Sequence, residues 1–438
     1  MGIKGTGMGN HRVLMVSFAF YPCGTVGALR ASTFSKYLPE FGWNPEVLTV
    51  KEKHYEIRDD ALLGQINPQM KVIKTGYFGI ETLKPLLSGF RARKEAAANK
   101  KDPTCLKSTI RPAPESWFDL PRGVGWLPFG LLRGVPAAKR CEAIWATSPL
   151  QVGLCLGALL SKLTGRPFVA DFQDPWYLPE LSPYPTALHT KVNRCWERFV
   201  LKTASLVVVT TDETKEMYKD LYSVDDDKII VVHNGYDTTD FDQSAPSASS
   251  VEQGELRIGY LGSLYQGREL YMLQLMEALK AMAEKNPQRK IKLHVRGRKP
   301  QRAVQLADAA NAKDVVDIGG HISHKQAVEM MKAMDILVLI AAPKHTHALP
   351  QKVLEYIGAG KPVLAITPEG ATSRFVQQHG IGITAEPGET GSIERALEAL
   401  TKDYGSYLKH IETAAAEFTS RALSEKLAGA LTKACETA

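Results

Sequence analysis

The chain has 438 residues, of which 44% are hydrophobic and 23% are charged. This length exceeds what a single hydrophobic core usually serves, so we expect two domains of an ordinary soluble protein. No run approaches the ~20 consecutive apolar residues of a membrane span. Residues 1–10 are polar and glycine-rich, unlike a secretory signal, and we expect them to form a flexible leader.

The six cysteines are scattered and form no Cys-x-x-Cys pair. This pattern is typical of reduced thiols, so we expect a cytoplasmic protein without a thiolate metal site. His345 and His347 lack an evident third ligand, and the Asp-x-Asp motif at 240–242 lies in a polar loop. We therefore predict that no metal is required.

The net charge of +7 is uneven along the chain. Residues 71–140 hold fourteen Lys or Arg against five Asp or Glu, together with Trp117, Phe118, Trp126 and Phe129. A basic stretch with aromatic side chains suits an anionic membrane surface or an acidic acceptor, whereas a solvated excursion with a few core aromatics is the plainer alternative. We predict no nucleic-acid partner, and we retain peripheral attachment to the inner face of the membrane through 71–140 as a hypothesis.

The first half of the chain alternates short apolar runs with helical patterns. A β-rich run at its start is followed by a glycine turn and a helical pattern over 28–41, which together indicate a βαβ opening. Near-continuous apolar runs separated by helices are typical of a buried parallel sheet. We predict strands at 12–17, 46–50, 143–146, 167–170 and 205–209.

The second half repeats this pattern after a polar stretch at 238–254. We predict strands at 256–261, 290–295, 315–318, 335–340, 362–366 and 382–384, with helices at 269–285 and from 393 onward. The predicted fold class is therefore α/β, with two Rossmann-like domains whose parallel sheets face each other across a cleft. The expected divisions are an N-terminal acceptor domain at 11–240, a linker at 241–254, a C-terminal donor domain at 255–415 and a terminal helix at 416–438 that packs back on the first domain.

The most informative stretch runs from Pro350 to Ala365. It is predicted to be a short helix that Gly358 and Gly360 end, followed by a buried strand. Glu355 is a carboxylate inside this apolar and basic element, so it needs a cation or hydrogen bonds from a ligand, and the two hydroxyls of a ribose would supply them. Lys352 lies three residues earlier on a related face. A surface lysine and a capping glutamate are the simpler alternative.

A glycine turn joins a strand to a helix at Gly262-Ser263-Leu264-Tyr265-Gln266-Gly267, and Arg268 follows it. The turn lacks the Gly-Lys-Ser/Thr ending of a nucleotide-triphosphatase loop. Backbone N–H groups and the positive end of the helix dipole would suit a diphosphate there. An ordinary tight turn between a strand and a helix would have the same sequence.

As an ordered set, several motifs resemble the GT-B glycosyltransferases of family 4, which are retaining enzymes that use nucleotide-sugars. The resemblance covers nearly the whole chain from Arg12. It is carried by Phe20-Tyr21-Pro22 with Gly24, Gly27 and Arg30; Asp171-Phe172-Gln173-Asp174-Pro175-Trp176; His233-Asn234-Gly235-Tyr236-Asp237; Tyr260-Leu261-Gly262-Ser263-Leu264; and Pro350 through Pro362. The second of these motifs departs from the relatives that read Asp-Phe-Arg-Asp-Pro-Trp, because Gln173 stands in its middle.

The resemblance implies roles for individual residues. Glu355 would hold the donor ribose, and His347 stands where the family has its first motif glutamate, against the transferred sugar. Gly24, Gly27 and Arg30 would contact the acceptor, while Asp171 and Asp174 would orient it or serve as structural residues. The other donor-binding residues would be Gly262, Ser263, Arg268, Leu349, Pro350, Lys352 and Val353.

The resemblance also implies an activity. The expected reaction is transfer of a hexose-type sugar from a nucleotide-sugar, with UDP as the default nucleotide, to a glycan, lipid-linked or small-molecule acceptor in polysaccharide or glycoconjugate biosynthesis. A sugar-nucleotide epimerase or a phosphorylase on the same fold remains an alternative. A further alternative is a non-catalytic relative that binds a nucleotide-sugar, because the first motif glutamate is replaced and the phosphate loop is altered.

Overall fold

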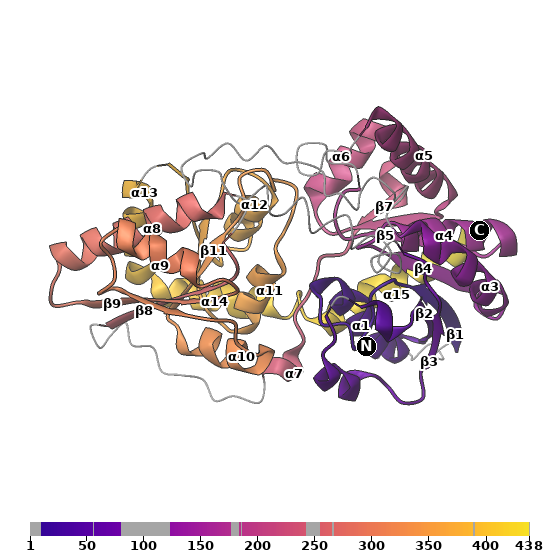
Figure 1. Ribbon diagram of the computed structural model, residues 1–438, viewed down its shortest axis with the longest axis horizontal. Helices are drawn as coiled ribbons and strands as arrows, with labels where there is room; N and C mark the ends of the chain where they lie inside the picture. Colours follow the sequence, from indigo (N-terminus) through magenta and orange to yellow (C-terminus); the bar gives the residue numbers. More distant parts are fainter. Residues whose placement is uncertain are drawn as a thin grey trace, which may run out of the picture. The chain divides into compact units, whose positions relative to one another are not determined.

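The computed structural model describes residues 10–55, 57–79, 123–176, 184, 186–241, 255–264, 267–388 and 390–437. The chain forms two compact units, each built on one sheet (Figure 1). Unit 1 holds the described residues up to Val209, then Lys215–Val232 and those from Ser424 onward. Unit 2 holds Thr210–Thr214 and His233–Leu423.

Unit 1 contains a seven-stranded parallel sheet of strand order β3-β2-β1-β4-β5-β6-β7. Its elements in chain order are β1 (His11–Val16), α1 (Val26–Tyr37), β2 (Trp43–Val50), β3 (Lys71–Thr75), α3 (Leu127–Ala138), β4 (Ala143–Thr147), α4 (Val152–Thr164), β5 (Phe168–Phe172), α5 (Ala187–Thr203), β6 (Leu206–Val209), most of α6 (Asp212–Tyr222), β7 (Ile229–Val231) and most of α15 (Ser420–Glu436). The strand order changes direction between β1 and β4, which places a topological switch point there.

Both faces of the first sheet are buried, because alternate residues of each strand point to opposite sides. Leu14 and Val16 of β1 pack in one core with residues of α3, α4 and α5. The last helix, α15, also packs in this unit, where Thr432 accepts a hydrogen bond from the indole of Trp43 at 3.3 Å. The continuous apolar strands predicted from the sequence are thus strands covered on two sides.

Unit 2 contains a six-stranded parallel sheet of order β10-β9-β8-β11-β12-β13. Its elements are α7 (Thr238–Phe241), β8 (Glu255–Leu261), α8 (Arg268–Lys285), β9 (Lys290–Arg296), α9 (Gln301–Ala309), β10 (Val316–Gly319), α10 (His324–Ala333), β11 (Ile336–Ile340), α11 (Gln351–Gly358), β12 (Val363–Ile366), α12 (Ala371–Gln378), β13 (Gly382–Ala385), α13 (Thr390–Lys402) and α14 (Tyr404–Ala415). One core joins the sheet to α8, α9 and α13, and another joins it to α10, α11, α12 and α14. The switch point lies between β8 and β11, which pair in register.

The two parallel sheets confirm the predicted fold class, and every predicted strand is present with bounds that differ by up to three residues. Two strands escaped prediction, β3 and β7, and they are the two edges of the first sheet. The polar stretch expected from residue 238 begins instead with the short helix α7, because the carboxylate of Asp237 accepts the N–H of Thr239 at 3.1 Å. Among the described residues, no helix has the length and apolar content needed to cross a membrane.

Candidate functional site

The predicted donor residues lie at the switch point of the second sheet. Since β8 and β11 run parallel side by side, the loops that follow them emerge at the same edge. The loop after β8 carries Gly262 and Ser263, and the segment after β11 carries 341–350 and then α11. The structure therefore brings together, on one edge of unit 2, residues that are separated by almost ninety positions in the sequence.

The loop after β8 approaches the end of β9 too closely for a side chain to fit between them. The N–H of Gly262 donates to the carbonyl of Arg296 at 3.0 Å, and a Cβ added at Gly297 would lie 2.0 Å from the carbonyl oxygen of Gly262. Gly267 precedes α8 with φ +90, a left-handed conformation that glycine adopts without strain. Its N–H is bound by the carboxylate of Glu269 at 3.1 Å. Tyr265 and Gln266 lie outside the described residues.

Arg268 begins α8 and is close enough to His345 to act on its charge state. Burial lowers the pKa of His345, and the positive charge of Arg268 lowers it further, so the imidazole is neutral at pH 7. Its Nε2 is buried and makes no hydrogen bond within the part of the chain that the structure describes. The described residues contain no group of three His, Cys, Asp or Glu side chains that could hold a metal ion.

The carboxylate of Glu355 is buried in α11 and paired within the helix. Its Oε2 accepts a hydrogen bond from the Nζ of Lys352 at 2.6 Å, and the two side chains form an i,i+3 ion pair. No hydrogen bond from a described residue reaches Oε1. Glu355 thus has the cation that its burial requires and keeps one oxygen available for a ligand.

A second charged pair borders Glu355, and the sequence analysis did not identify it. The Nε2 of His324, at the start of α10, lies 2.9 Å from a carboxylate oxygen of Asp240. That hydrogen bond is the main cause that raises the pKa of His324, and the negative charge of Glu355 adds to it. A protonated His324 would be another cation near the predicted ribose position.

The apolar donor residues lie deeper than Glu355. Leu349 and Val353 are buried in the core that α11 shares with the sheet. Pro350 is extended, with φ −61 and ψ 137, and it is the N-cap residue directly before α11, where the N–H that proline lacks is not needed. These residues therefore shape the segment from within, and any contact with a ligand would come mainly from their backbone.

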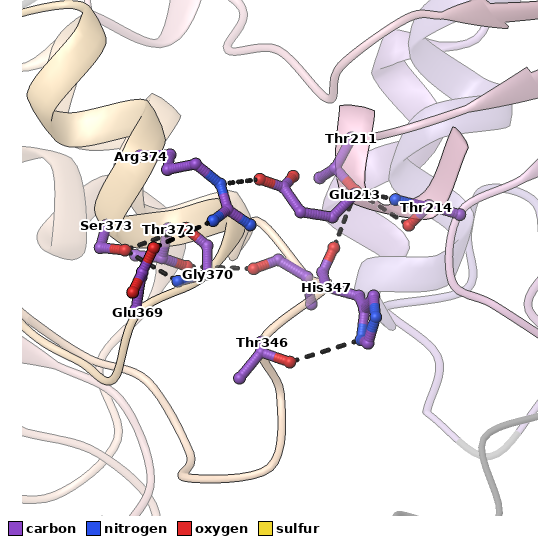
Figure 2. A network of polar contacts seen from close by, with 11 residues as sticks. Thr211, Glu213, Thr214, Thr346, His347, Glu369, Gly370, Thr372, Ser373 and Arg374 are labelled. Carbon is purple, nitrogen blue, oxygen red and sulfur yellow. Dashed lines mark hydrogen bonds and ion pairs between the residues drawn. The ribbon is translucent and has the colours of Figure 1, made fainter. Parts of the chain in front are cut away.

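The segment that bears His347 is fixed through its backbone (Figure 2). Three successive carbonyls accept hydrogen bonds: Thr346 from the N–H of Ala371 at 2.7 Å, His347 from the hydroxyl of Thr211 at 2.8 Å, and Ala348 from the hydroxyl of Thr372 at 3.0 Å. A Cβ at Gly370 would lie 2.4 Å from the carbonyl oxygen of Thr346, so the start of α12 must be glycine. The ring of His347 is half-buried, and its Nδ1 lies 3.4 Å from the hydroxyl of Thr346.

An ion pair ties the two elements that hold this segment. Arg374 of α12 binds the carboxylate of Glu213, in the first turn of α6, at 2.6 Å, and it also reaches Glu369 at 3.4 Å (Figure 2). Thr211 caps α6 by accepting the N–H of Thr214 at 3.2 Å. Thr211 was not identified from the sequence, where no local pattern connects it with His347.

The acceptor-side glycines lie at the switch point of the first sheet. A Cβ at Gly27, in the first turn of α1, would lie 2.2 Å from the ring of Pro149, which follows β4. A Cβ at Gly24 would meet the side chains of Ile57 and Asp59 at 3.1 and 3.2 Å. Both glycines therefore allow the loop after β1 to lie close to its neighbours, whether or not an acceptor binds there.

Asp171 and Arg30 form a buried ion pair in unit 1. The guanidinium contacts both carboxylate oxygens at 2.8 Å, and the hydroxyl of Thr147 donates to Oδ2 at 2.7 Å. Arg30 also donates to the carbonyl of Val232 at 2.9 Å and lies over the ring of Phe34. Since Asp171 is fully buried and Arg30 nearly so, this geometry favours the structural alternative for Asp171, with Arg30 as its partner.

Asp174, three residues beyond Asp171, has a different environment. Its side chain is exposed and makes no hydrogen bond or ion pair with the described residues. Enough protein atoms nevertheless surround the carboxyl group that desolvation raises its pKa. Gln173, which lies between Asp171 and Asp174 in the sequence, donates from its side-chain amide to the hydroxyl of Thr147 at 3.1 Å and to the carbonyl of Ser148. Asp174 is therefore the aspartate of this motif that an acceptor could reach.

Two family models match the sequence. The model for glycosyl transferases group 1 matches residues 255–417, and the model for glycosyltransferase family 4 matches residues 87–240. Together they cover more than half of the chain. The chain belongs to the family 4 glycosyltransferases, with the GT-B fold.

Individual relatives are distant. A D-inositol 3-phosphate glycosyltransferase of Nocardia farcinica is 24% identical over 218 residues, which are 47% of this chain and 47% of that protein, so the chain spans about half the length of the curated relative it matches. A glycosyltransferase from Rickettsia africae superposes with a TM-score of 0.64 at 16% identity, covering 97% of this chain and 98% of that one. The N-terminal domain of the Candida albicans trehalose-6-phosphate phosphatase gives 0.67 at 12% identity, covering 99% of both chains. At such identities the structures show the fold alone.

Proposed function

We propose that the protein transfers a hexose-type sugar from a nucleotide-sugar, with a UDP-sugar as the expected donor, and that the configuration of the transferred carbon is retained. The observation that carries this proposal is the state of Glu355 at the switch-point edge of unit 2. Lys352 holds Oε2, and Oε1 receives no hydrogen bond from the described residues. Two adjacent ribose hydroxyls would donate to this carboxylate with charge-assisted hydrogen bonds.

The remaining donor residues then have natural roles around that ribose. The backbone of Gly262 and Ser263 would contact the diphosphate, together with Arg268 and the N-terminus of α8. His347 would lie against the transferred sugar, on a segment shaped by Leu349, Pro350 and Val353. His345, neutral because of burial and Arg268, could donate or accept a hydrogen bond there without adding charge.

The reaction needs stabilisation of a leaving diphosphate. The bond between the anomeric carbon and the phosphate oxygen breaks, a bond forms from the acceptor hydroxyl oxygen, and the hydroxyl proton passes to the leaving phosphate. Cations and helix N–H groups aimed at the growing phosphate charge stabilise the transition state more than the ground state. Arg268 and the start of α8 would supply that charge without a required metal.

On the acceptor side, we propose that Asp174 orients the attacking hydroxyl, while Asp171 and Arg30 maintain the loop on which it depends. The acceptor would be a glycan, a lipid-linked sugar or a small molecule. The name of the Nocardia relative makes inositol phosphate the first small molecule to test. We expect the reaction to serve polysaccharide or glycoconjugate biosynthesis in the cytoplasm.

Product analysis with a radiolabelled UDP-hexose tests this proposal against its alternatives. A labelled glycoside, formed only when an acceptor is added and only by the parent protein, supports transfer. A labelled isomer of the nucleotide-sugar would indicate an epimerase, and a labelled sugar phosphate formed with inorganic phosphate would indicate a phosphorylase. Binding of the donor with no new product from any acceptor in the panel would favour the non-catalytic alternative.

A further inference from the structure

Three neighbouring helices of unit 1 have an outer surface that is basic and apolar. α3 contacts α4, and α4 contacts α5 (Figure 1). Gly130 and Gly134 of α3 lie against Leu156 and Leu160 of α4, where a Cβ would come within 2.3 and 2.9 Å, so these two helices pack closely. The basic residues of the three helices are Arg133, Lys162, Lys191, Arg194, Arg198 and Lys202.

The same helices present no exposed acid. Their one acidic residue is Glu197, which is 1% exposed and accepts a hydrogen bond from the hydroxyl of Tyr222. Asp225, outside these helices, lines the adjacent hollow with Arg198 and Lys202 and marks one border of the basic surface. A positive potential therefore extends over the outer side of α3, α4 and α5 without an internal negative charge.

Apolar side chains lie between these cations. A hollow of about 550 Å³ between α4 and α5 is lined by Leu159, Leu188, Lys191, Val192, Cys195, Trp196 and Phe199. Leu188 is 62% exposed, and Leu163 of α4 is 59% exposed. Trp196 and Phe199 form an edge-to-face pair with ring centroids 5.8 Å apart. Exposed leucines beside an aromatic hollow are costly in water unless something covers them.

We propose that this outer surface of α3, α4 and α5 docks on an anionic lipid bilayer. A bilayer offers a negatively charged headgroup layer above an apolar layer, which matches cations placed beside exposed leucines and an aromatic hollow. Lys191 and Lys202 carry long apolar stems, so their ammonium groups can reach headgroups while the leucines lie deeper. A nucleic acid would match the charge but would leave the apolar hollow without a role.

The docking surface is independent of the proposed transfer activity, because it uses no residue of the donor or acceptor site. Among the described elements of the basic stretch at 71–140, only α3 contributes to this docking surface. The apolar part of the surface lies on α4 and α5. Bringing the enzyme to a membrane would favour acceptors that are themselves anchored in lipid.

Vesicle flotation of the full chain tests the proposal without any nucleotide-sugar. The probes are vesicles of phosphatidylcholine alone and vesicles of equimolar phosphatidylcholine and phosphatidylglycerol, each at low and at high salt. We expect binding to the anionic vesicles at low salt, little binding to the neutral ones, and loss of most binding at high salt. Equal binding to both vesicle types, or no binding to either, would overturn the proposal.

Matched variants locate the surface. Leu188→Glu with Lys191→Glu changes an exposed leucine and an exposed lysine on α5, whereas Leu408→Glu with Lys409→Glu makes the same changes on α14 of unit 2. The α5 variant should bind anionic vesicles at least roughly five-fold more weakly, and the α14 variant should bind like the parent. Because all four side chains are exposed, both variants should keep the melting temperature of the parent.

Three results would contradict this location. Parent-like flotation of the α5 variant would place the lipid contact elsewhere in the chain. Retention of the parent protein on DNA or RNA but not on vesicles would identify a nucleic-acid surface. A dimer that the α5 changes dissociate, with no vesicle binding, would identify an interface between two copies of the chain.

Discussion

At the scale of single residues, the pairing of Glu355 with Lys352 decides between two explanations of α11. If the ion pair were only structural, each residue would matter for stability and neither for donor binding. If Glu355 also binds a ribose through Oε1, its loss must affect the donor directly, because Lys352 engages only Oε2. Replacing each partner in turn separates these explanations.

Glu355→Ala should raise the donor Michaelis constant roughly 10- to 150-fold, because it removes charge-assisted hydrogen bonds of about 1.5–3 kcal/mol. Lys352→Ala leaves the carboxylate in place, with Oε1 still available to a ribose, and should raise the donor Michaelis constant less than Glu355→Ala does. Steady-state kinetics with variable donor and saturating acceptor measure both effects. Equal losses of stability in the two variants, with unchanged Michaelis constants, would leave only the structural explanation.

Asp174 gives a prediction about pH. Desolvation raises the pKa of its carboxyl in the folded protein above the ordinary range of an aspartate, so the folded state favours the protonated form. The free energy of unfolding that this carboxyl contributes is fully present below its pKa in the unfolded chain. It is lost as pH rises from that value through the higher pKa of the folded protein. Asp174→Asn removes the titration.

The melting temperature of Asp174→Asn should consequently exceed that of the parent near neutral pH, and the difference should shrink as pH falls towards 4. Thermal unfolding followed by circular dichroism across this range measures it. Glu369→Gln is a suitable control, because it makes the matching acid-to-amide change at a carboxylate whose side chain is 88% exposed. A difference between Asp174→Asn and the parent that is the same at every pH would refute the assignment.

At the scale of elements, the start of α6 and the start of α12 hold the segment that bears His347. The three carbonyls of Thr346, His347 and Ala348 are all engaged, so this segment has little freedom to rearrange. In the role we propose for it, a half-buried His347 on a fixed backbone would discriminate between sugars by position and hydrogen bonding. The family's glutamate at this position would have placed a charge there instead.

Thr211→Val removes the hydrogen bond to the carbonyl of His347 and also the cap of α6. It should raise the donor Michaelis constant roughly 2- to 10-fold, in line with a net hydrogen-bond contribution of about 0.5–1.5 kcal/mol. Thr211→Ser keeps the hydroxyl and should restore most of the affinity. Thr401→Val, which removes a hydroxyl that bonds within α13, should not change it. Identical Michaelis constants for the valine and serine variants at position 211 would contradict the positioning role.

Central strands that helices cover on both sides were predicted readily from the sequence. The strand β11 (Ile336–Ile340), for example, is apolar throughout because helices cover both sides, and that pattern is visible without a structure. The missed strands β3 and β7 are sheet edges, where one side lacks a strand partner. In β3, Lys71 and Lys74 are exposed, and Lys74 lies between the buried Ile73 and Thr75, so the apolar run that marks a central strand is broken.

At the scale of the whole molecule, the gathering of donor residues follows from topology, and this part of the site could be predicted. Glu355, Gly262 and Arg268 were each placed after a strand, and parallel strands end at a common edge. The contacts of Thr211 with His347 and of Glu213 with Arg374 join residues 136 and 161 positions apart, and no local pattern encodes them. The pairing of Arg30 with Asp171, 141 positions apart, escaped prediction for the same reason.

The most direct test of the account is a thermal-shift panel of UDP-, GDP- and ADP-sugars on the full chain, with Glu355→Ala beside the parent and a chelator in every well. A ligand at 100 times its dissociation constant should stabilise the folded protein by about 2.7 kcal/mol. We predict that a UDP-sugar raises the melting temperature of the parent and leaves that of Glu355→Ala almost unchanged. Equal stabilisation of both proteins, or no stabilisation of the parent by any nucleotide-sugar, would contradict the donor site that we propose in unit 2.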